Sequence, residues 1–342
     1  MTPGADHEPS TTVAEHERRL IGGPREFTVV DLAREAGCSV GFARRFWRAM
    51  GFPNVTDDAV AFTQADVHAL RLITRLVDDG VIDTTTAVSL LRAQSHTTDR
   101  LVLWQTEALV EGIARRLDLD DTSARLVVLD RVTELSDVLQ QELLYAWRRQ
   151  LAALTVRIDA EVAQRNAGDN DPDVLPLVRG LGFVDMVAYT RRSADLGSHA
   201  LAELVQGFEF TARDVITANG ARVVKTIGDA VLFIADDLPT TTRVAVELIA
   251  ALQSRPTLLP VRASMVWGRV VSRSGDVFGP TVNLASRLVD VAPAGSVLTD
   301  QATAEAIQAG PDAQRYTIVP HSTAELQGLG MVTPMEIRRL PS

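Results

Sequence analysis

The 342-residue sequence is almost without lysine and cysteine: it has one of each, Lys225 and Cys38, beside 33 arginines. A single cysteine excludes an intrachain disulfide and a cysteine-based zinc cluster. No segment approaches the roughly 18 consecutive apolar residues of a membrane span, and residues 1–10 lack a basic region that leads into an apolar run. We therefore expect a cytoplasmic protein with no membrane anchor.

The lone lysine is the first residue that needs an explanation. Lysine presents a compact ammonium group and arginine a planar fork of donors, so one lysine among many arginines favours a site with a specific donor requirement. The alternative is that the arginine bias reflects genome composition and that the position of Lys225 is accidental. Lys225 opens the segment Lys-Thr-Ile-Gly-Asp, residues 225–229.

Length and composition indicate a globular chain of about two domains. Apolar residues make up 46% of the sequence, which is sufficient for two ordinary cores. The formal net charge of −10 argues against a general binder of nucleic acid or of anionic membranes.

The apolar pattern changes at a segment rich in Gly, Asn, Asp and Pro, residues 166–172. Before it, over residues 25–165, apolar residues recur at helical spacing and predict an all-α domain, preceded by a flexible tail over residues 1–24. The segment itself predicts a linker over residues 166–177. After it, residues 178–342 alternate short strand-like runs with longer amphipathic segments.

The elements of the second half follow the order β-α-β-β-α-β, the ferredoxin-like arrangement, and predict an α+β fold. Gly228-Asp229 predicts a tight hairpin turn, because such pairs tolerate the positive φ that these turns require. We expect strands at residues 182–187, 221–227, 230–234 and 261–271, and helices at 200–218, 240–253 and 282–291.

Three short segments of this half carry polar residues that need a functional explanation. In the first, Asp185 interrupts an apolar strand before a turn, which is costly unless the acid is paired or holds a metal. The second contains Asp229 of the predicted hairpin; if the two strands are neighbours, both carboxylates meet at one edge and suit Mg²⁺ or Mn²⁺. The third begins at Asp276 and includes Asn283 and Arg287, four residues apart and therefore on one face of a helix.

Each of these residues also has an ordinary structural explanation. Asp185 could cap a strand end and Asp229 could form the turn. Asn283 could begin the helix, and Arg287 could be a solvated cation. Their joint order and spacing are far more specific than any one of them.

The joint pattern resembles the catalytic domain of class III adenylate and guanylate cyclases over residues 178–340, about half of the chain. The resemblance implies that Asp185 and Asp229 hold two divalent ions, Mg²⁺ or Mn²⁺, with the backbone carbonyl of Met186 as a further ligand. It implies that Lys225 donates to a ring nitrogen of adenine and that Asp276 accepts from the exocyclic amine. Guanylate-specific members typically have an acid at the lysine position, so this pair favours ATP over GTP.

The resemblance also assigns roles at the sugar and the phosphates. Asn283 would orient the ribose, and Arg287 would stabilise charge on the α-phosphate in the transition state. Tyr189 and Thr190 would bind substrate in a turn where the family usually has Gly-Phe-Thr. Gln327 stands where the family often has a lysine for the terminal phosphates, and the sequence does not identify its replacement.

The implied enzyme is an adenylate cyclase, a phosphorus-oxygen lyase that converts ATP to 3′,5′-cyclic AMP and pyrophosphate. The 3′-hydroxyl attacks the α-phosphorus while one metal lowers the pKa of that hydroxyl and the other neutralises the leaving phosphates. Members of the family form the active site between two catalytic domains, one with the two acids and one with the base-reading, amide and guanidinium groups. Because this chain has both sets, the resemblance implies a homodimer with two shared active sites.

Residues 27–66 resemble the helix-turn-helix of MerR-type regulators, with Gly37 at the turn and three arginines on the second helix, Arg44, Arg45 and Arg48. Residues 1–165 hold 19 Arg against 25 Asp and Glu, a balance that disfavours contacts with DNA phosphates. We therefore expect that DNA is not the partner of this domain.

The N-terminal half more closely resembles the helical domains that regulate soluble actinobacterial-type cyclases. We expect residues 25–165 to bias the catalytic dimer between competent and incompetent arrangements, through a long helix over residues 124–164. Protons or a small apolar ligand are the candidate effectors, and the histidines that could titrate near neutrality are His68, His96, His199 and His321. The alternative function is a DNA-binding or signalling regulator whose cyclase-like domain binds nucleotide without turnover.

Overall fold

The computed structural model of the chain describes residues 11–166, 177–189, 191–192, 196–273 and 275–340. The chain divides into two compact units, residues 1–169 and 170–342, and each has its own apolar cores. None of the helices in these described ranges combines the length and the apolar character that a membrane crossing requires.

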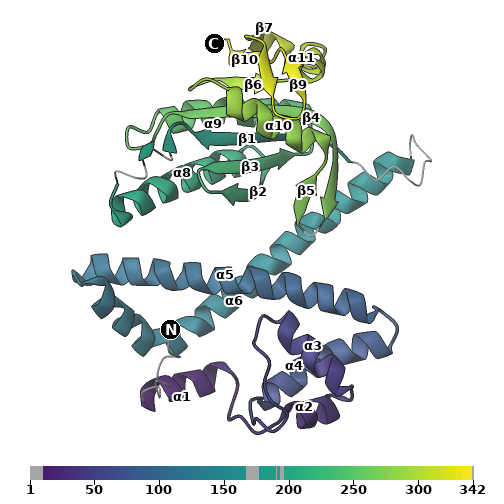
Figure 1. Ribbon diagram of the computed structural model, residues 1–342, viewed down its shortest axis with the longest axis vertical. Helices are drawn as coiled ribbons and strands as arrows, with labels where there is room; N and C mark the ends of the chain where they lie inside the picture. The colour runs from purple at the N-terminus through teal and green to yellow at the C-terminus, as the bar shows by residue number, and fades with distance from the viewer. Residues whose placement is uncertain (1–10, 167–176, 190, 193–195, 274, 341–342) are drawn as a thin grey trace. The chain divides into compact units, whose positions relative to one another are not determined.

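The first unit consists of helices, as the spacing of its apolar residues predicted (Figure 1). Its helices are α1 (Thr11–Leu20), α2 (Val29–Ala36), α3 (Val40–Ala49), α4 (Gln64–Asp78), α5 (Thr84–Leu117) and α6 (Asp121–Asn166). The fully buried side chains of Leu32, Phe62 and Leu70 form the centre of the core that holds α2, α3 and α4 together.

Local sequence explains the sharp turn between α2 and α3. Thr28 and Asp31 form a capping box that begins α2, and Gly37 ends it at φ 75°, a left-handed conformation that glycine adopts without steric cost. Ser39 then accepts a hydrogen bond from the Phe42 amide and begins α3. The predicted pair of helices is therefore present; its similarity to MerR-type regulators stays a prediction.

Residues 11–20, which we expected to belong to a flexible tail, form helix α1. This helix contacts α6: the Nδ1 atom of His16 lies 3.3 Å from the Thr133 hydroxyl, and Arg19 lies 3.4 Å from Asp137. The prediction was wrong here because the Gly and Pro residues that suggested a loop flank the helix at both ends and do not interrupt it.

The second unit is α+β, in agreement with the sequence prediction. Its strands are β1 (Leu177–Met186), β2 (Arg222–Ile227), β3 (Ala230–Ala235), β4 (Val261–Arg273), β5 (Asp276–Phe278), β6 (Val297–Thr299), β7 (Tyr316–Pro320), β8 (Ala324–Leu326), β9 (Gly330–Val332) and β10 (Met335–Arg339). Its helices are α8 (Ser198–Ala218), α9 (Leu238–Gln253), α10 (Pro280–Val291), α11 (Gln301–Gln308) and the 3₁₀ turn η1 (Ala313–Arg315).

The main sheet has the strand order β2-β3-β1-β4-β6-β10-β7. Its first four strands are mutually antiparallel, and with α8 and α9 as connections they form the ferredoxin-like β-α-β-β-α-β arrangement. The predicted hairpin is present between β2 and β3, with Gly228 at φ 61°. The sheet continues through β6, which is parallel to β4, and then β10 and β7; we predicted none of these strands from sequence.

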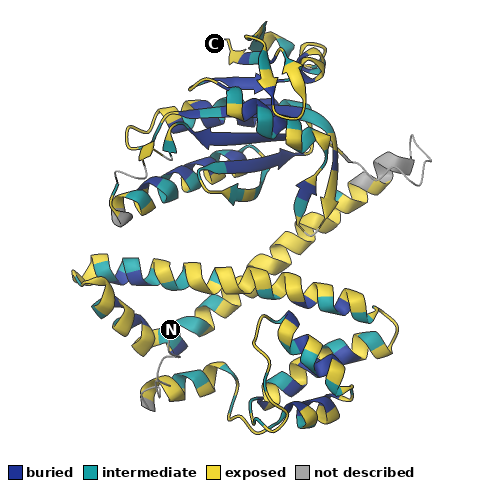
Figure 2. Ribbon diagram, viewed as in Figure 1, coloured by how far each residue is buried: buried dark blue, intermediate teal, exposed yellow. Residues whose placement is uncertain are grey.

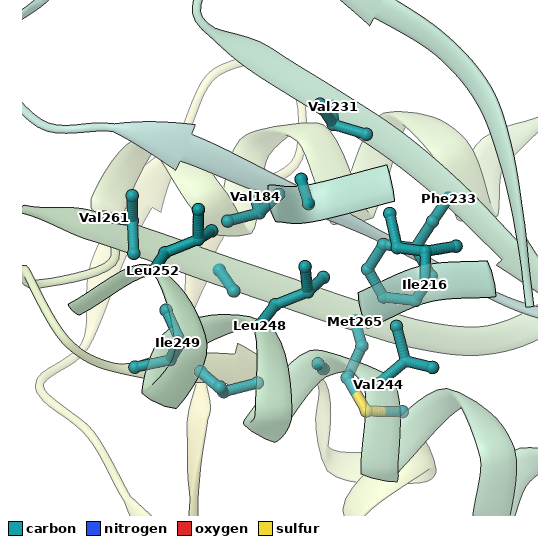
Figure 3. Close-up of a cluster of buried hydrophobic side chains, with 14 of the residues drawn as sticks. Val184, Ile216, Val231, Phe233, Val244, Leu248, Ile249, Leu252, Val261 and Met265 are labelled. Atoms are coloured by element: carbon teal, nitrogen blue, oxygen red, sulfur yellow. The ribbon is translucent and has the colours of Figure 1, made fainter. Parts of the chain in front are cut away.

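Side chains alternate between the two faces of the sheet, and helices cover both faces (Figure 2). Val184 of β1 packs with α8 and α9 in the core that Figure 3 shows, together with Phe233, Leu248 and Met265. The preceding residue, Phe183, faces α10 on the other side of the sheet. β1 and β4 are buried on both faces. The position of a polar residue in the strand therefore fixes the face of the sheet toward which its side chain points.

Candidate active site

Asp185 and Asp229 lie together at one end of the sheet. Asp185 is near the end of β1, and its register partner on β3 is Ala230, the residue that follows Asp229 in the hairpin. The backbone amide of Met186 donates a 3.1 Å hydrogen bond to the backbone carbonyl of Asp229. The two strands are thus neighbours, which was the condition for the two carboxylates to meet at one edge.

The residue Asp185 is only 9% exposed, and its carboxylate is paired with Arg262 of β4. The Nε and Nη2 atoms of the guanidinium lie 2.8 and 2.7 Å from the Oδ2 atom of Asp185. Burial raises the pKa of Asp185, Arg262 lowers it, and the nearby charges of Asp229 and Asp290 raise it further, so that the pKa lies above the usual value for aspartate.

Arg262 was missed in the sequence analysis. It is the register partner of Asp185 in the antiparallel β1–β4 pair, and it also donates a 2.6 Å hydrogen bond to the backbone carbonyl of Asp290. The sequence feature that could have indicated Arg262 is its position as a charged residue inside the apolar run Val261–Val266. Such a residue is costly in a buried strand unless it has a partner, which is the same reason that drew attention to Asp185.

The residues at this end of the sheet fit a divalent cation. The described residues contain no group of three or more His, Cys, Asp and Glu side chains arranged to hold a metal. The protein donors available here are two carboxylates and a main-chain carbonyl. That is a donor set typical of Mg²⁺, which completes its shell with water and substrate phosphates. Both contacts of Arg262 with Asp185 are to the Oδ2 atom, and a cation would relieve the repulsion between Asp185 and Asp229.

Lys225 and Asp276 form an ion pair across 51 residues of sequence. The Nζ atom of Lys225, on β2, lies 2.5 Å from the Oδ2 atom of Asp276, on β5, while Oδ1 of Asp276 accepts a 2.8 Å hydrogen bond from the Val277 amide. Partial burial raises the pKa of Asp276, but the hydrogen bonds from Lys225 and Val277 outweigh it and hold this pKa below its usual value. Asp276 therefore stays ionised at neutral pH.

Asn283 and Arg287 lie on α10, whose first turn follows Gly279 at φ 132°. Asn283 is exposed and Arg287 is half-buried, and their spacing of four residues places them on one face, as predicted. Arg287 has a loose contact of 3.4 Å with Asp290 one turn further on. A partly exposed ion pair of this length contributes little to stability. Breaking it so that Arg287 can bind another anion would therefore cost little free energy.

No hydrogen bond or ion pair in the described parts of the chain joins the Asp185–Asp229 pair to Lys225, Asp276 or Asn283. Met186 follows Asp185 in sequence at the end of β1, and its backbone amide bonds to Asp229. Thr190 lies outside the described residues, and Tyr189 packs against the core of the second unit. Gln327 is exposed in the turn between β8 and β9.

Ala188, in the turn after β1, has a φ of 62°, in the left-handed region. This conformation costs a residue with a Cβ atom about 1 kcal/mol relative to glycine. We expect Ala188→Gly to raise the free energy of unfolding by about that amount in urea denaturation. Ala309→Gly is the matched control: Ala309 is exposed with φ −82°, and there glycine should give no gain. A loss of stability in Ala188→Gly would contradict the strained turn.

Comparison with known proteins identifies the family. The chain is 40% identical over 333 residues to an adenylate cyclase of Glutamicibacter nicotianae, covering 95% of this chain and 82% of that one. It is 37% identical over 346 residues to an adenylate cyclase of Streptomyces coelicolor, covering 94% and 88% of the two chains. The chain therefore belongs to the adenylate cyclase family and is an enzyme of this class.

No family model matches the sequence. Among solved structures, an adenylyl cyclase from P. aeruginosa is similar to 48% of this chain and 96% of its own, with 19% sequence identity and a TM-score of 0.41. A third relative, an adenylate cyclase of Streptomyces griseus, is 41% identical over 289 residues, which cover 84% of this chain and 70% of that protein.

Proposed function

We propose that the chain converts ATP to 3′,5′-cyclic AMP and pyrophosphate in a homodimer of class III architecture. Family membership supports the reaction type. The Lys225–Asp276 ion pair is the observation that favours adenine over guanine as the base of the substrate. The most direct experiment incubates the purified full chain with ATP and Mn²⁺ and assays cyclic AMP. Absence of product with either Mg²⁺ or Mn²⁺ would contradict the proposal.

Lys225 and Asp276 present one donor and one acceptor side by side, the pattern that the N1 and exocyclic amine of adenine require. Guanine reverses this pattern, because its N1 is a donor and its 6-position carries an oxygen. The ion pair already fixes the orientation of both side chains before a nucleotide binds. Binding therefore costs little further side-chain entropy.

Lys225→Glu should therefore weaken the preference for ATP. The substitution removes the hydrogen bond that the lysine would donate to adenine, and it places a second carboxylate next to Asp276. The ratio of kcat/KM for ATP to kcat/KM for GTP should therefore fall by about 10- to 100-fold. The measurement is steady-state kinetics with both nucleotides, with Lys225→Arg as the control that keeps the charge. An unchanged ratio would remove Lys225 from the base-reading site.

At the phosphate end, Asp185, Asp229 and the Met186 carbonyl would hold Mg²⁺ or Mn²⁺. When bound, the ions would activate the 3′-hydroxyl and neutralise the leaving phosphates. Arg262 would position the Asp185 carboxylate through its two contacts with Oδ2, and it lowers the pKa of Asp185 against the larger effect of burial. Arg262, which contacts Asp185, is also our candidate to replace the lysine absent at Gln327.

Arg262→Gln should raise KM for the metal–ATP complex by about 10- to 100-fold, since supporting groups around metal ligands contribute on that scale. Arg262→Lys keeps the charge but loses the two-point contact, so it should fall between Arg262→Gln and the unmodified chain. Equilibrium binding of Mn²⁺, followed separately from activity, should weaken in the same order. Equal KM values in all three proteins would show that Arg262 has no role at the phosphates.

Arg287 would stabilise the charge that develops on the α-phosphate, and Asn283 would hold the ribose so that its 3′-hydroxyl faces the phosphorus. Tyr189 and Thr190 belong to the turn that would bind the triphosphate. Each site would take its two acids from one chain and its base-reading, amide and guanidinium groups from the other. The exposed, register-paired Val271 and Phe278 on the β4–β5 arm are available to contact the second chain.

The first unit is proposed to regulate the second. Candidate proton acceptors differ in exposure: His68 and His96 are exposed on α4 and α5, and His321 is half-buried in the catalytic unit. The test compares cyclic AMP formation by the full chain and by residues 170–342 across pH. Identical rates and pH profiles would remove the regulatory role.

DNA binding by the first unit is the weaker alternative. Arg45 and Arg48 are exposed on α3, but Arg44 is paired with Asp57, which removes one of three cations from the face that would meet DNA. A domain that binds nucleotide without turnover is the second alternative, and the exposed Gln327 is the feature that favours it. The cyclic AMP assay separates that alternative from the proposed reaction.

A further inference from the structure

Helix α10 is tied to strand β4 by side-chain hydrogen bonds along its length. Near the start of the helix, the Thr281 hydroxyl donates a 2.7 Å bond to the backbone carbonyl of Arg269 on β4. In the middle, the Ser264 hydroxyl of β4 donates a 2.6 Å bond to the backbone carbonyl of Ala285. The buried face of α10 also packs with β4 in a shared apolar core (Figure 1). These contacts fix the position of α10 on the sheet as far as its last turn.

The last turn of α10 is held by Arg262 of β4. The final carbonyls of a helix have no partner within the helix. The structure describes α10 completely, and its last turn contains no basic residue; its C-cap, Ala292, has φ −70° and ψ 132°, so the left-handed turn that satisfies these carbonyls in many helices is missing. Arg262 donates a 2.6 Å hydrogen bond from Nη1 to the carbonyl of Asp290. It thereby supplies a donor and the positive charge that a helix C-terminus favours.

The same guanidinium group contacts Asp185. Its Nε and Nη2 atoms lie 2.8 and 2.7 Å from the Oδ2 atom of that carboxylate, while Nη1 bonds to the carbonyl of Asp290. The side chain of Arg262 is 24% exposed, and three of its nitrogen atoms are engaged. Because a guanidinium group is planar and rigid, a movement at one of these contacts displaces the other.

In the proposed homodimer, the two contacts of Arg262 belong to different active sites. Asp185 of a chain serves one site, whereas Asn283 and Arg287 on α10 of the same chain serve the other. We propose that Arg262 is a positioning residue for both sites: it orients the metal-binding acid of one site and, through the last turn of α10, the guanidinium group of the other. This inference rests on the proposed function, because it requires sites shared by two chains.

The position of Arg287 explains why the contact at the helix end should affect the reaction rate. Arg287 lies three residues before Asp290 and therefore in the turn that Arg262 holds. Helix ends fray when their last carbonyls lack partners. A misplacement of about 1 Å in a group that acts in the transition state costs up to about 100-fold in rate. We therefore expect kcat to depend on this contact more than KM does.

Mixed dimers separate the two roles of Arg262. A dimer of one Asp185→Asn chain and one Arg287→Ala chain has a single intact site, with its acids from the Arg287→Ala chain and its α10 from the Asp185→Asn chain. In the Asp185→Asn chain, Arg262 therefore acts on the intact site only through α10. Adding Arg262→Gln to this chain should lower kcat for cyclic AMP formation by the mixture about tenfold and change KM for metal–ATP by less than about twofold.

Arg262→Gln in the other chain should give the opposite pattern. In the Arg287→Ala chain, Arg262 is next to the acids of the intact site, so its loss should raise KM for metal–ATP by about 10- to 100-fold and change kcat little. A general loss of stability would lower activity alike in both arrangements. Circular dichroism and sedimentation velocity check that the fold and the mixed dimer are retained.

Two variants of the Asp185→Asn chain complete the test. Arg255→Gln is the matched control, since Arg255 is exposed in the loop after α9, and it should change neither constant. Arg262→Lys keeps a donor for the carbonyl of Asp290 and should return kcat to within about threefold of the parent mixture.

The outcomes distinguish this inference from the proposed function. An unchanged kcat with Arg262→Gln in the Asp185→Asn chain, or an Arg262→Lys mixture as slow as the Arg262→Gln mixture, would overturn the inference and leave the proposed function intact. An inactive mixture of the two parent variants, Asp185→Asn and Arg287→Ala, would overturn the shared sites and this inference with them.

Discussion

Replacing Asp185 by asparagine should abolish detectable cyclic AMP formation. Asparagine keeps the size of the side chain and one oxygen for Arg262, but it removes the negative charge that a divalent cation needs. The protein also loses the mutual repulsion with Asp229 that a bound cation would relieve. The measurement is cyclic AMP formed from ATP with Mg²⁺ or Mn²⁺, together with Mn²⁺ binding to the folded variant.

Asp185→Ala is the harsher variant, because it leaves the partly buried guanidinium of Arg262 with one partner fewer and is expected to lower stability as well. Circular dichroism of Asp185→Asn establishes that any loss of activity is not a loss of the fold. Activity within about tenfold of the unmodified chain in Asp185→Asn would exclude a metal role for this carboxylate.

Arg287→Ala should lower kcat by roughly 10³- to 10⁵-fold, if charge stabilisation in this reaction matches that by arginine in related phosphoryl transfers. KM for ATP should change much less, since the interaction is strongest in the transition state. The effect on folding should be small, because the ion pair that Arg287 makes within the described residues is a loose 3.4 Å contact with Asp290.

Arg255→Ala is a suitable control for the Arg287 variant, since Arg255 is exposed in the loop after α9 and away from α10. It should keep kcat within a few-fold of the unmodified chain. An Arg287→Ala protein that loses affinity for ATP but keeps kcat would show that this arginine binds substrate equally in the ground and transition states.

Much of the catalytic unit could be predicted from sequence because the residues that determine each of these helices and strands are close together in the sequence. Runs of apolar residues separated by Gly-Asp or by amphipathic segments predicted β1 to β4 and α8 to α10, although β1 begins at Leu177 and not at residue 182. Gly228 has the positive φ that the hairpin turn requires. Lys225 and Asp276 were singled out separately, and the structure places their charged groups 2.5 Å apart.

The elements that were not predicted depend on contacts distant in sequence. Strands β6, β8 and β9 have three residues each, too few to show a period, and they exist because the sheet pairs them. Arg262 could be recognised only once its register with Asp185 was known, since one arginine in a strand has several explanations. Helix α1 was missed because glycine and proline on both sides of it dominated the local pattern.

One experiment tests the roles of the individual site residues together with the shared site. Asp185→Asn and Arg287→Ala remove one residue from each of the two proposed sets, so either protein alone should be inactive. In an equal mixture, random exchange of subunits makes half of the dimers mixed, and each mixed dimer has one site with both residues intact. The expected activity of the mixture is about one quarter of that of the unmodified chain.

The decisive measurement is therefore cyclic AMP formation by that mixture after the two variants have been allowed to exchange subunits. Recovery to about a quarter of the unmodified rate is the result we predict for sites built from two chains. A mixture that stays as inactive as its components, although subunit exchange is verified by mass, would contradict it.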